Sequence, residues 1–588
     1  MSETKSRWMA ALALLGIVLG ALALRLHGIG FGLPHMTYRD GMVIYTQVKE
    51  IRTGDAELRK DEFWGYYPHV TSRFAALFDD AELAPLVAPL DVDGHVARAA
   101  QPWISLRRSS VLLSLLTVVG AYWIARRFMG RGGSLLAAAF AATSLLHLSF
   151  SQQEKPHGPV SGTVALALAA ALWLADKPTQ TRMWLAVAAA AIAACTLQSG
   201  GIVLGGLGVL WLCWCFERPL PKARLLLAPL CVALLGVLAV RYFYPFHFVE
   251  TGAALPEHEL AESSQEVVLD LAGHPFFLRP KFTGGKVVLS TLVNYDPSLL
   301  LFGLIGIGFF VVDRMRRLPR DLLHRRALAI VLGATLPFLF VLISYDAKVT
   351  FERFLMPMVA CFACLAAYGV TRVGKALPQS LRRAPILTAL GVLAVLPATA
   401  AAWKLTAVRA APDTWTQVAH WIRANVDPQA KIYTVPYIDV PLFKDEASLR
   451  ESGRTEEINY WARYAREIPE DLRTGPNYRI VIPKAPQRAQ EEFGADPIGH
   501  LRSLGADYVV VQAAAEDSRN VLLAKIRKQL AGEEELVFRT SPIGDPATGR
   551  GQFALRYTQE LGVQPLALRV FEANAYGNTI EVYRLRRP

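Results

Sequence analysis

A short group of ionisable and aromatic residues follows the first long apolar run of the chain. The segment "GLPHMTYRDG" contains Tyr38, Arg39 and Asp40 about a dozen residues after that run ends. A carboxylate at this point can accept a proton or help to hold a divalent cation, and an arginine can bind a phosphate through its bidentate fork. The simpler alternative is an interfacial salt bridge between Arg39 and Asp40. The segment therefore indicates either a reaction centre or an interfacial ion pair.

Three other segments between apolar runs carry polar groups of the same kind. They are "DEFWGYYPH" with Tyr67, "SQQEKPHGP" with Glu154, Lys155 and His157, and "SYDAKVTFERF" with Lys348 and Arg353. Lysine and arginine suit a phosphate group, although at helix ends they often only extend toward the interface. With Tyr38 and Arg39, these residues are the candidates for binding an anionic substrate.

The composition places these groups on a membrane protein. Of 588 residues, 53% are hydrophobic and 19% are charged, whereas an ordinary soluble protein has about 25% charged residues. The deficit lies before about residue 405. The net charge of +12 comes largely from short Arg-rich links between apolar runs, so membrane topology explains it better than nucleic-acid binding does.

We expect about eleven transmembrane helices, because that many apolar runs are long enough to cross a bilayer. The first run ends without a small-residue cleavage site, which favours a retained span over a signal peptide. "QSGG" at residues 198–201 divides a stretch that is too long for one crossing. The expected spans lie near residues 9–26, 109–125, 133–150, 158–175, 183–198, 201–216, 225–243, 298–312, 327–344, 354–371 and 385–403.

Charge in the links sets the expected orientation. One alternate set of links, together with the N-terminus, holds about twenty Lys and Arg residues, and the short links of the other set hold about three. The N-terminus is therefore expected in the cytoplasm. Two loops, at about 27–106 and 244–297, and the part of the chain after residue 405 are expected outside, in a multi-pass protein of a plasma membrane, such as the bacterial inner membrane.

The chain after residue 405 predicts a small α/β domain. Helix-like pieces such as "TWTQVAHWIRANV" and "VLLAKIRKQLAG" alternate with strand-like pieces such as "KIYTV", "DYVVVQ" and "TIEVYRL". We expect a membrane domain over 1–405 and an extracytoplasmic domain over 406–588. The second domain has no recognisable catalytic motif, which favours a role in positioning or recognising an acceptor.

Metal and thiol chemistry have weak support. All six cysteines lie within apolar runs and have no ligand partners at zinc-site spacing, so they are expected to pack as small apolar residues. Asp91-Val-Asp93 has the form of a metal-binding pair, but two acidic residues in a charged loop are weak evidence. Asp40 is the candidate ligand of a divalent cation, Mg or Mn.

The order of these motifs resembles the GT-C glycosyltransferases, specifically the protein-O-mannosyltransferase-like group that uses polyprenyl-phosphate (or dolichyl-phosphate) sugars. "RLHGIGFGLPHMTYRDG" is similar to the first-loop opening of that family, which typically ends in H-P-D-E. "TGDAELRKDEFWGYYPHV", "LRRSSVLLSLLTVVGAYWIARRFMGRGGSLLAAAFAATSLLHLSFS" and "FERFLMPMVACFACLAAYGV" resemble later segments in the same order. The resemblance spans about 370 residues.

The resemblance implies a GT-C fold and an inverting transfer of a hexose or pentose from a polyprenyl-phosphate donor to an acceptor on the outer face. It places Asp40 at the catalytic position. The acceptor can be a protein, a lipid or a polysaccharide of the cell envelope.

The chain departs from the family pattern at three positions. Gly41 stands where the family has a Glu, His157 where it has an Asp, and Gln198 where it often has a Lys. These changes fit either an unusual substrate or a non-catalytic protein that binds lipid-linked sugars. A transporter of lipids or glycans is the other alternative, but it predicts charged spans and matching halves, which the sequence does not contain.

Overall fold

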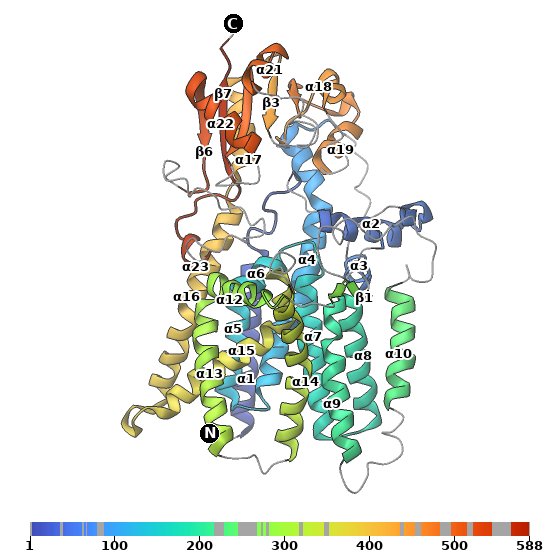
Figure 1. Cartoon of the computed structure of the whole chain (residues 1–588), viewed down its shortest axis with the longest axis vertical. Coiled ribbons are helices and arrows are strands. Elements are labelled where there is room, and N and C mark those ends of the chain that lie inside the picture. Colours follow the sequence, from blue (N-terminus) through green and yellow to red (C-terminus); the bar gives the residue numbers. More distant parts are fainter. Residues whose placement is uncertain are drawn as a thin grey trace.

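The protein is elongated, with a helical part at one end and a sheet-containing domain, here called the tail, at the other (Figure 1). The N-terminus and the tail lie at opposite ends of the helical part. The computed structural model describes residues 3–35, 39–60, 64–65, 67–78, 88–216, 228–244, 267–271, 274–277, 281–316, 322–345, 352–435, 440–452, 460–482, 496–513, 521–543 and 566–586.

A helix occupies each stretch where the sequence predicts a span, and most of these helices run along the long axis (Figure 1). The helices are α1 (Glu3–Leu26), α4 (Val92–Ala125), α5 (Arg131–Thr143), α6 (Leu145–Ser151), α7 (His157–Asp176), α8 (Gln180–Thr196), α9 (Ile202–Phe216), α10 (Ala228–Phe243), α13 (Pro297–Arg316), α14 (Leu322–Ser344), α15 (Val359–Ala376) and α16 (Ala384–Ala410).

Length and apolarity single out fewer spans than the sequence predicts. Within the described residues, seven helices are long and apolar enough to cross a membrane, or up to nine if each of two bent pairs is one span. At the two remaining positions, α8 and α10 are shorter, with 17 and 16 residues. Eleven crossings therefore stay a prediction.

The span expected at 133–150 is not one straight helix. It breaks at Ser144 into α5 and α6, which meet at a bend of 54°. Asp296 explains why the break is tolerated, because its carboxylate accepts hydrogen bonds from the Ser144 hydroxyl at 2.6 Å and from the amides of Leu145 and Leu146 at 2.8 and 3.4 Å. Backbone amides freed by the break therefore have a partner.

Small residues let the central helices approach closely. A Cβ atom built on Gly162 of α7 would overlap the carbonyl oxygen of Leu113 in α4, and one on Gly120 would lie 2.5 Å from the Cβ of Ala165. Packing of this kind is typical of helices in a bilayer, where close backbone contact rather than hydrophobic burial drives association.

The two long loops predicted between spans contain helices that the loop prediction did not include. Helix α2 (Arg39–Thr53) runs across the direction of the predicted spans (Figure 1). Helix α12 (Gly284–Tyr295) meets α13 at 118°. The other short elements between the predicted spans are η1 (Ala56–Lys60), α3 (Val70–Ala75), η2 (Gln198–Gly201), β1 (Val267–Leu271), β2 (His274–Phe277), η5 (Glu352–Met358) and η6 (Gln379–Leu381).

The tail is an α/β domain, as the sequence predicts. Its sheet has the order β4-β3-β5-β7-β6, in which β3 is parallel to β4 and β5 while β7 is antiparallel to β5 and β6. The elements are α17 (Thr414–Asn425), β3 (Ile432–Val435), α18 (Glu446–Glu451), α19 (Tyr460–Glu467), η8 (Glu470–Leu472), β4 (Ile480–Val481), α21 (Pro497–Ser503), β5 (Tyr508–Ala513), α22 (Val521–Glu533), β6 (Glu535–Thr540), α23 (Leu566–Arg569) and β7 (Thr579–Arg584).

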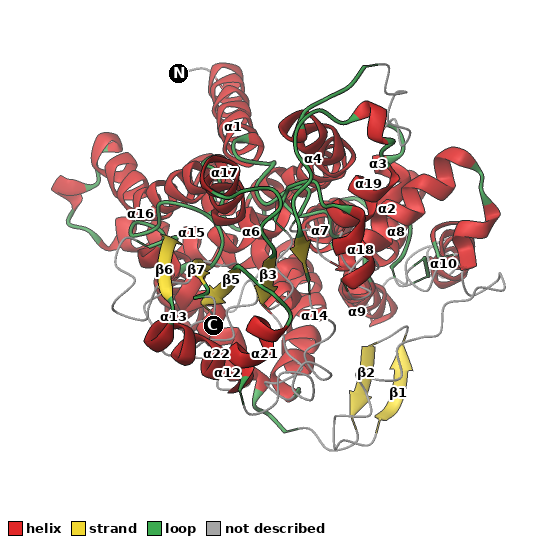
Figure 2. Ribbon diagram, turned by 90° about the horizontal axis from the view of Figure 1, so that it is seen from above, coloured by secondary structure: helices red, strands yellow, loops and turns green. Residues whose placement is uncertain are grey.

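Helices cover both faces of this sheet. Figure 2 shows α17 on one side and α21 and α22 on the other. Alternate residues of β5 face the two sides of the sheet. Val510 belongs to the same buried cluster as Ile422 of α17, and Val509 belongs to the same buried cluster as Leu501 of α21. The sequence predicts the strands from short runs of β-branched residues, and the structure adds that their side chains alternate between the two faces.

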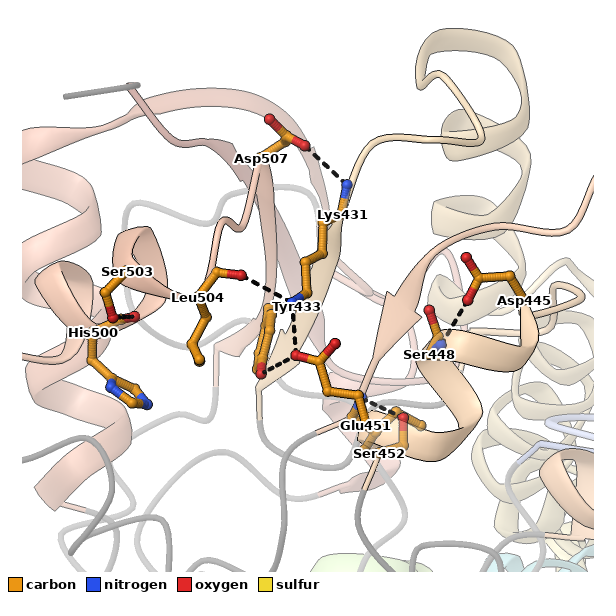
Figure 3. A network of polar contacts seen from close by, with 11 residues as sticks. Lys431, Tyr433, Asp445, Ser448, Glu451, Ser452, His500, Ser503, Leu504 and Asp507 are labelled. Carbon is orange, nitrogen blue, oxygen red and sulfur yellow. Dashed lines mark hydrogen bonds and ion pairs between the residues drawn. The ribbon is translucent and has the colours of Figure 1, made fainter.

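A polar network joins the start of β3 to its neighbours inside the tail (Figure 3). The ammonium group of Lys431 donates hydrogen bonds to Glu451 at 2.7 Å and to the carbonyl of Leu504 at 2.9 Å. The hydroxyl of Tyr433 donates to the same carboxylate at 3.3 Å, and Asp507 accepts from the backbone amide of Lys431 at 3.0 Å. These contacts lie within the tail and stabilise its own fold.

Candidate active site

Helix α2, whose first turn contains Asp40, begins beside the turn between α6 and α7. The backbones of Arg39 and Asp40 form the first turn of α2, while their side chains, and Tyr38 altogether, lie outside the described residues. A Cβ atom built on Gly41 would lie 2.9 Å from Oε1 of Glu154 and closer still to its Cγ. The carboxylate of Glu154 therefore occupies the space in which a side chain at position 41 would start.

A buried arginine holds Glu154 in this place. Nε of Arg107 in α4 donates to Oε2 of Glu154 at 2.6 Å, and both side chains are fully buried. Nη1 of Arg107 also donates to the carbonyls of Ile29 and Phe31, at 2.8 Å each. Among the residues that the structure describes, Oε1 of Glu154 accepts no hydrogen bond. Since buried polar atoms are rarely left without a partner, this oxygen is the one suited to a ligand.

The chain before α2 is fixed by aromatic and cationic contacts. The ring of Phe31 lies 4.3 Å from the guanidinium of Arg107 and 4.2 Å from that of Arg409 in α16. Arg409 donates to the side-chain oxygen of Gln152, whose amide donates to the carbonyls of Arg25 and His27 at 2.8 and 3.0 Å. The turn that carries Glu154 is thereby tied to the ends of α1 and α16.

Aromatic residues line another side of the same turn. The ring of His157 meets Tyr67 edge to face at a centroid distance of 6.0 Å, and both residues are buried. Gln47 of α2 positions this part of the first loop, because its amide donates to the carbonyls of Trp64 and Tyr67 at 2.7 and 2.8 Å.

His69 is a buried neutral group rather than a proton donor. Its ring packs edge to face on Trp64 at 4.9 Å. Burial, with a further contribution from the positive charge of Arg73, lowers the pKa of His69 from 6.5 to about 3. An imidazole with this pKa carries no charge near neutral pH.

The candidates Lys348 and Arg353 lie in or just before η5, which packs against α6, α7 and η2. The guanidinium of Arg353 lies 5.9 Å from the ring centroid of Phe354. Lys348 lies outside the described residues, and Lys155 is buried within the α6–α7 turn. The amide of Gln198 in η2 donates to the hydroxyl of Tyr244 at 2.6 Å. The structure thus gathers Glu154, Lys155, His157 and Tyr67 around one turn, with η5 packed on the helices at either side of it.

Sequence reasoning missed Arg107, Phe31 and Arg409. The only signal for Arg107 was a pair of arginines at the start of an apolar run, which an interfacial position also explains.

The carboxylates of Asp91 and Asp93 have other partners than a metal. Asp91 caps α4 by accepting from the amide of Gly94 at 2.8 Å, and Asp93 accepts from Arg423 of the tail at 2.9 Å.

The described side chains do not suit a divalent cation. No group of three His, Cys, Asp or Glu residues lies together within the described part of the chain. One oxygen of Glu154 is bound by a guanidinium, and the other accepts no hydrogen bond from the described residues. The side chain of Asp40, the predicted ligand of a divalent cation, lies outside the described residues, so this role of Asp40 stays a prediction.

No family model and no curated protein sequence matches this chain. Among solved structures, the apo oligosaccharyltransferase of Archaeoglobus fulgidus aligns at 13% identity with a TM-score of 0.47, covering 89% of this chain and 72% of that one. Apo ArnT from Cupriavidus metallidurans aligns at 14% identity with a TM-score of 0.42, covering 91% and 97%.

The Pmt1-Pmt2 complex, an S. cerevisiae protein O-mannosyltransferase bound to its sugar donor, aligns at 16% identity with a TM-score of 0.31, covering 45% and 38%. With TM-scores below 0.5, these likenesses say nothing of what this chain acts on. The resemblance to the GT-C glycosyltransferases therefore continues to rest on the sequence motifs.

Proposed function

We propose that the protein is a membrane glycosyltransferase that moves a hexose or pentose from a polyprenyl-phosphate donor to an acceptor on the outer face. The observation that carries the proposal is the position of Glu154 against Gly41. The family resemblance calls for a Glu directly after the catalytic Asp, and this chain has glycine there. Glu154 brings a carboxylate into the same volume from a different turn, so that an acidic neighbour of Asp40 is kept.

The chemistry assigned to Asp40 is that of a general base. It accepts the proton of the acceptor hydroxyl while the acceptor oxygen bonds to the anomeric carbon and the bond from that carbon to the phosphate oxygen breaks. Attack from the face opposite to the phosphate inverts the configuration. As in other glycosyl transfers, the sugar gains oxocarbenium character, which the negative charge of Glu154 stabilises.

The departing phosphate needs positive charge and hydrogen-bond donors. We assign this role to Arg39, Lys155, Lys348 and Arg353, and the binding of the substrate to Tyr38, Tyr67 and His157. The buried position of Lys155 supports its part, because an ammonium group attracts a phosphate more strongly where water is excluded.

The proposed sidedness rests on the charge of the links, which favours a cytoplasmic N-terminus and an external tail. An external reaction has no access to nucleotide sugars, so the activated sugar must arrive on a lipid. The positions of the N-terminus and the tail at opposite ends of the helical part agree with this arrangement (Figure 1).

The test uses the purified full-length protein in lipid nanodiscs with a panel of polyprenyl-phosphate sugars and measures release of polyprenyl phosphate. We expect release from at least one donor and a loss of about tenfold or more in Glu154→Gln. The matched control is Glu57→Gln, since Glu57 follows α2 in the first loop and forms an exposed ion pair with Lys60. If the wild-type protein binds a donor but releases no polyprenyl phosphate, it is a binding protein. If Glu154→Gln releases polyprenyl phosphate at a near-native rate, Glu154 has no part in the reaction.

A further inference from the structure

The tail contacts the first outer loop on both sides of Asp40. We use "the Asp40 segment" for residues 29–47, which hold the end of the turn after α1 and the first half of α2. Within the described residues, three side chains of the tail touch this segment in the contacts given below, and they come from three separate places along the tail sequence. The contacts are Phe31 with Tyr576, His35 with Asp413, and Tyr45 with Tyr460.

The first contact completes the surroundings of Phe31. Tyr576 meets the Phe31 ring edge to face at a centroid distance of 4.9 Å, and it is almost fully buried. Because Arg107 contacts the same ring and also pairs with Glu154, Tyr576 is two side chains away from the proposed site.

The second contact is polar and buried. Nε2 of His35 lies 3.2 Å from Oδ1 of Asp413, with His35 fully buried and Asp413 only 8% exposed at their side chains. The same Asp413 oxygen caps α17 by accepting from the amide of Thr416 at 2.8 Å. The carboxylate of Asp413 therefore both caps the first helix of the tail and holds His35, the last residue described before α2.

The third contact joins α2 to the tail through aromatic rings. Tyr45 stacks on Trp103 of α4 at 5.3 Å, and Tyr460 of α19 meets both rings edge to face, at 5.5 Å from Tyr45 and 5.2 Å from Trp103. Burial, with the neighbouring Tyr45, raises the pKa of Tyr460, so the Tyr460 phenol is uncharged where the rings meet. Trp103 is fully buried, which fixes the position of the cluster.

The tail also holds α4 near its start. The ring of His95 lies within hydrogen-bond distance of the Tyr464 hydroxyl, at 3.2 Å, and of the carbonyl of Leu472, at 2.9 Å. These contacts set the distance between the tail and the membrane part, while the three contacts above act on the Asp40 segment itself.

We propose that the tail is a positioning part of the active site, with Asp413, Tyr460 and Tyr576 fixing the Asp40 segment from both sides. The inference rests on the proposed function of that segment. It differs from a role in acceptor recognition alone, because loosening the segment lowers the rate of the chemical step for every acceptor. A misplacement of about 1 Å at a reacting group can cost about a hundredfold in rate.

Two measurements test the inference on the full-length protein in nanodiscs. The first is hydrogen–deuterium exchange of peptides that cover residues 29–47, and the second is kcat and KM for donor and acceptor. The variants are Asp413→Asn, which keeps a side chain able to cap α17, Tyr460→Ala and its conservative partner Tyr460→Phe.

Two controls alter the tail without touching the segment. Arg423→Gln removes an exposed ion pair between the tail and Asp93 of α4. Lys431→Met removes the contacts of the Lys431 ammonium with Glu451 and the carbonyl of Leu504 inside the tail (Figure 3). If the inference holds, Asp413→Asn and Tyr460→Ala raise exchange and lower kcat by about tenfold or more, with donor KM changed by less than about threefold. Tyr460→Phe recovers most of kcat, and both controls stay within about twofold of wild type.

Unchanged exchange and kcat in Asp413→Asn and Tyr460→Ala would overturn the inference, and so would a rise in acceptor KM alone. The exchange measurement does not depend on turnover. If the wild-type protein transfers no sugar, the proposed function fails, while the exchange of residues 29–47 still decides whether the tail fixes this segment.

Discussion

The guanidinium of Arg107 and the carboxylate of Glu154 form an ion pair with 2.6 Å between Nε and Oε2, and neither side chain is exposed to solvent. The pair joins α4 to the turn between α6 and α7 at the point where α2 begins. Because Arg107 also binds the backbone of the turn before α2, it connects the two loops that the proposed reaction requires.

Removing one partner of this pair should destabilise the protein strongly. Arg107→Met leaves the Glu154 carboxylate buried without its counter-charge, which typically costs about 3–5 kcal/mol. The double variant Arg107→Met/Glu154→Met should be clearly more stable than the sum of the two single losses predicts. Thermal unfolding of the four proteins in one detergent measures this, and additive losses would show that the two charges do not interact.

Gly41 should be sensitive to the smallest substitution. A methyl group at position 41 collides with Glu154, which is buried and bound by Arg107 and therefore cannot turn aside freely. We expect Gly41→Ala to lower transfer by about tenfold or more. In a Glu154→Ala background the same substitution should add almost nothing, because the two changes act on one contact. An equal loss in both backgrounds would contradict the explanation.

Acid should destabilise the loop between α2 and α4 through His69. Its pKa is about 3 in the folded protein and 6.5 for an ordinary histidine, so between these pH values the unfolded chain binds a proton that the folded chain does not. The contribution of neutral His69 is complete above pH 6.5 and is lost as pH falls, at up to about 1.4 kcal/mol per pH unit. His69→Gln should therefore lose less Tm than wild type between about pH 7 and pH 5. The exposed His420 provides the control substitution, and identical Tm profiles for wild type and His69→Gln would refute the prediction.

The orientation can be measured without any substrate. A reporter that is active only outside the membrane should be active when fused after Pro588, since the Arg-rich links predict an external tail. A cytoplasm-only reporter fused at the same position should be inactive. The reverse pattern would invert the proposed topology.

The helical positions and the strands of the tail could be predicted because their signals are local. "DYVVVQ" alternates the two faces of β5, and apolar runs mark the helices whether or not they are straight. Helices α2 and α12 were not predicted, because short helices that lie across the spans leave no long apolar run. The break at Ser144 was also not predicted, since the residue that stabilises it, Asp296, is far away in the sequence.

The candidate site was only partly predictable for the same reason. Glu154, Lys155, His157 and Tyr67 were recognised from their residue types and positions in loops. That Glu154 lies against Gly41, or that Phe31 contacts Tyr576 near the other end of the chain, depends on tertiary packing. Neither contact has a signature in a single sequence, and the glycine at position 41 gives no indication of which residue lies beside it.

The central claim is that Asp40 is the base of a glycosyl transfer. Asn has nearly the size of Asp but lacks its charge, so Asp40→Asn should insert in the membrane, fold and bind the polyprenyl-phosphate sugar as wild type does. Loss of a general base typically costs about 10²–10⁴ in rate. Thermal unfolding and donor binding are the controls that separate a loss of chemistry from a loss of structure.

The decisive measurement is the turnover of purified Asp40→Asn beside wild type, with the donor on which wild type is most active. Turnover at least about a hundredfold lower, with donor affinity and Tm unchanged, is the result expected for a base. Near-native turnover would show that Asp40 is only an interfacial charge paired with Arg39, and that the reaction takes place elsewhere.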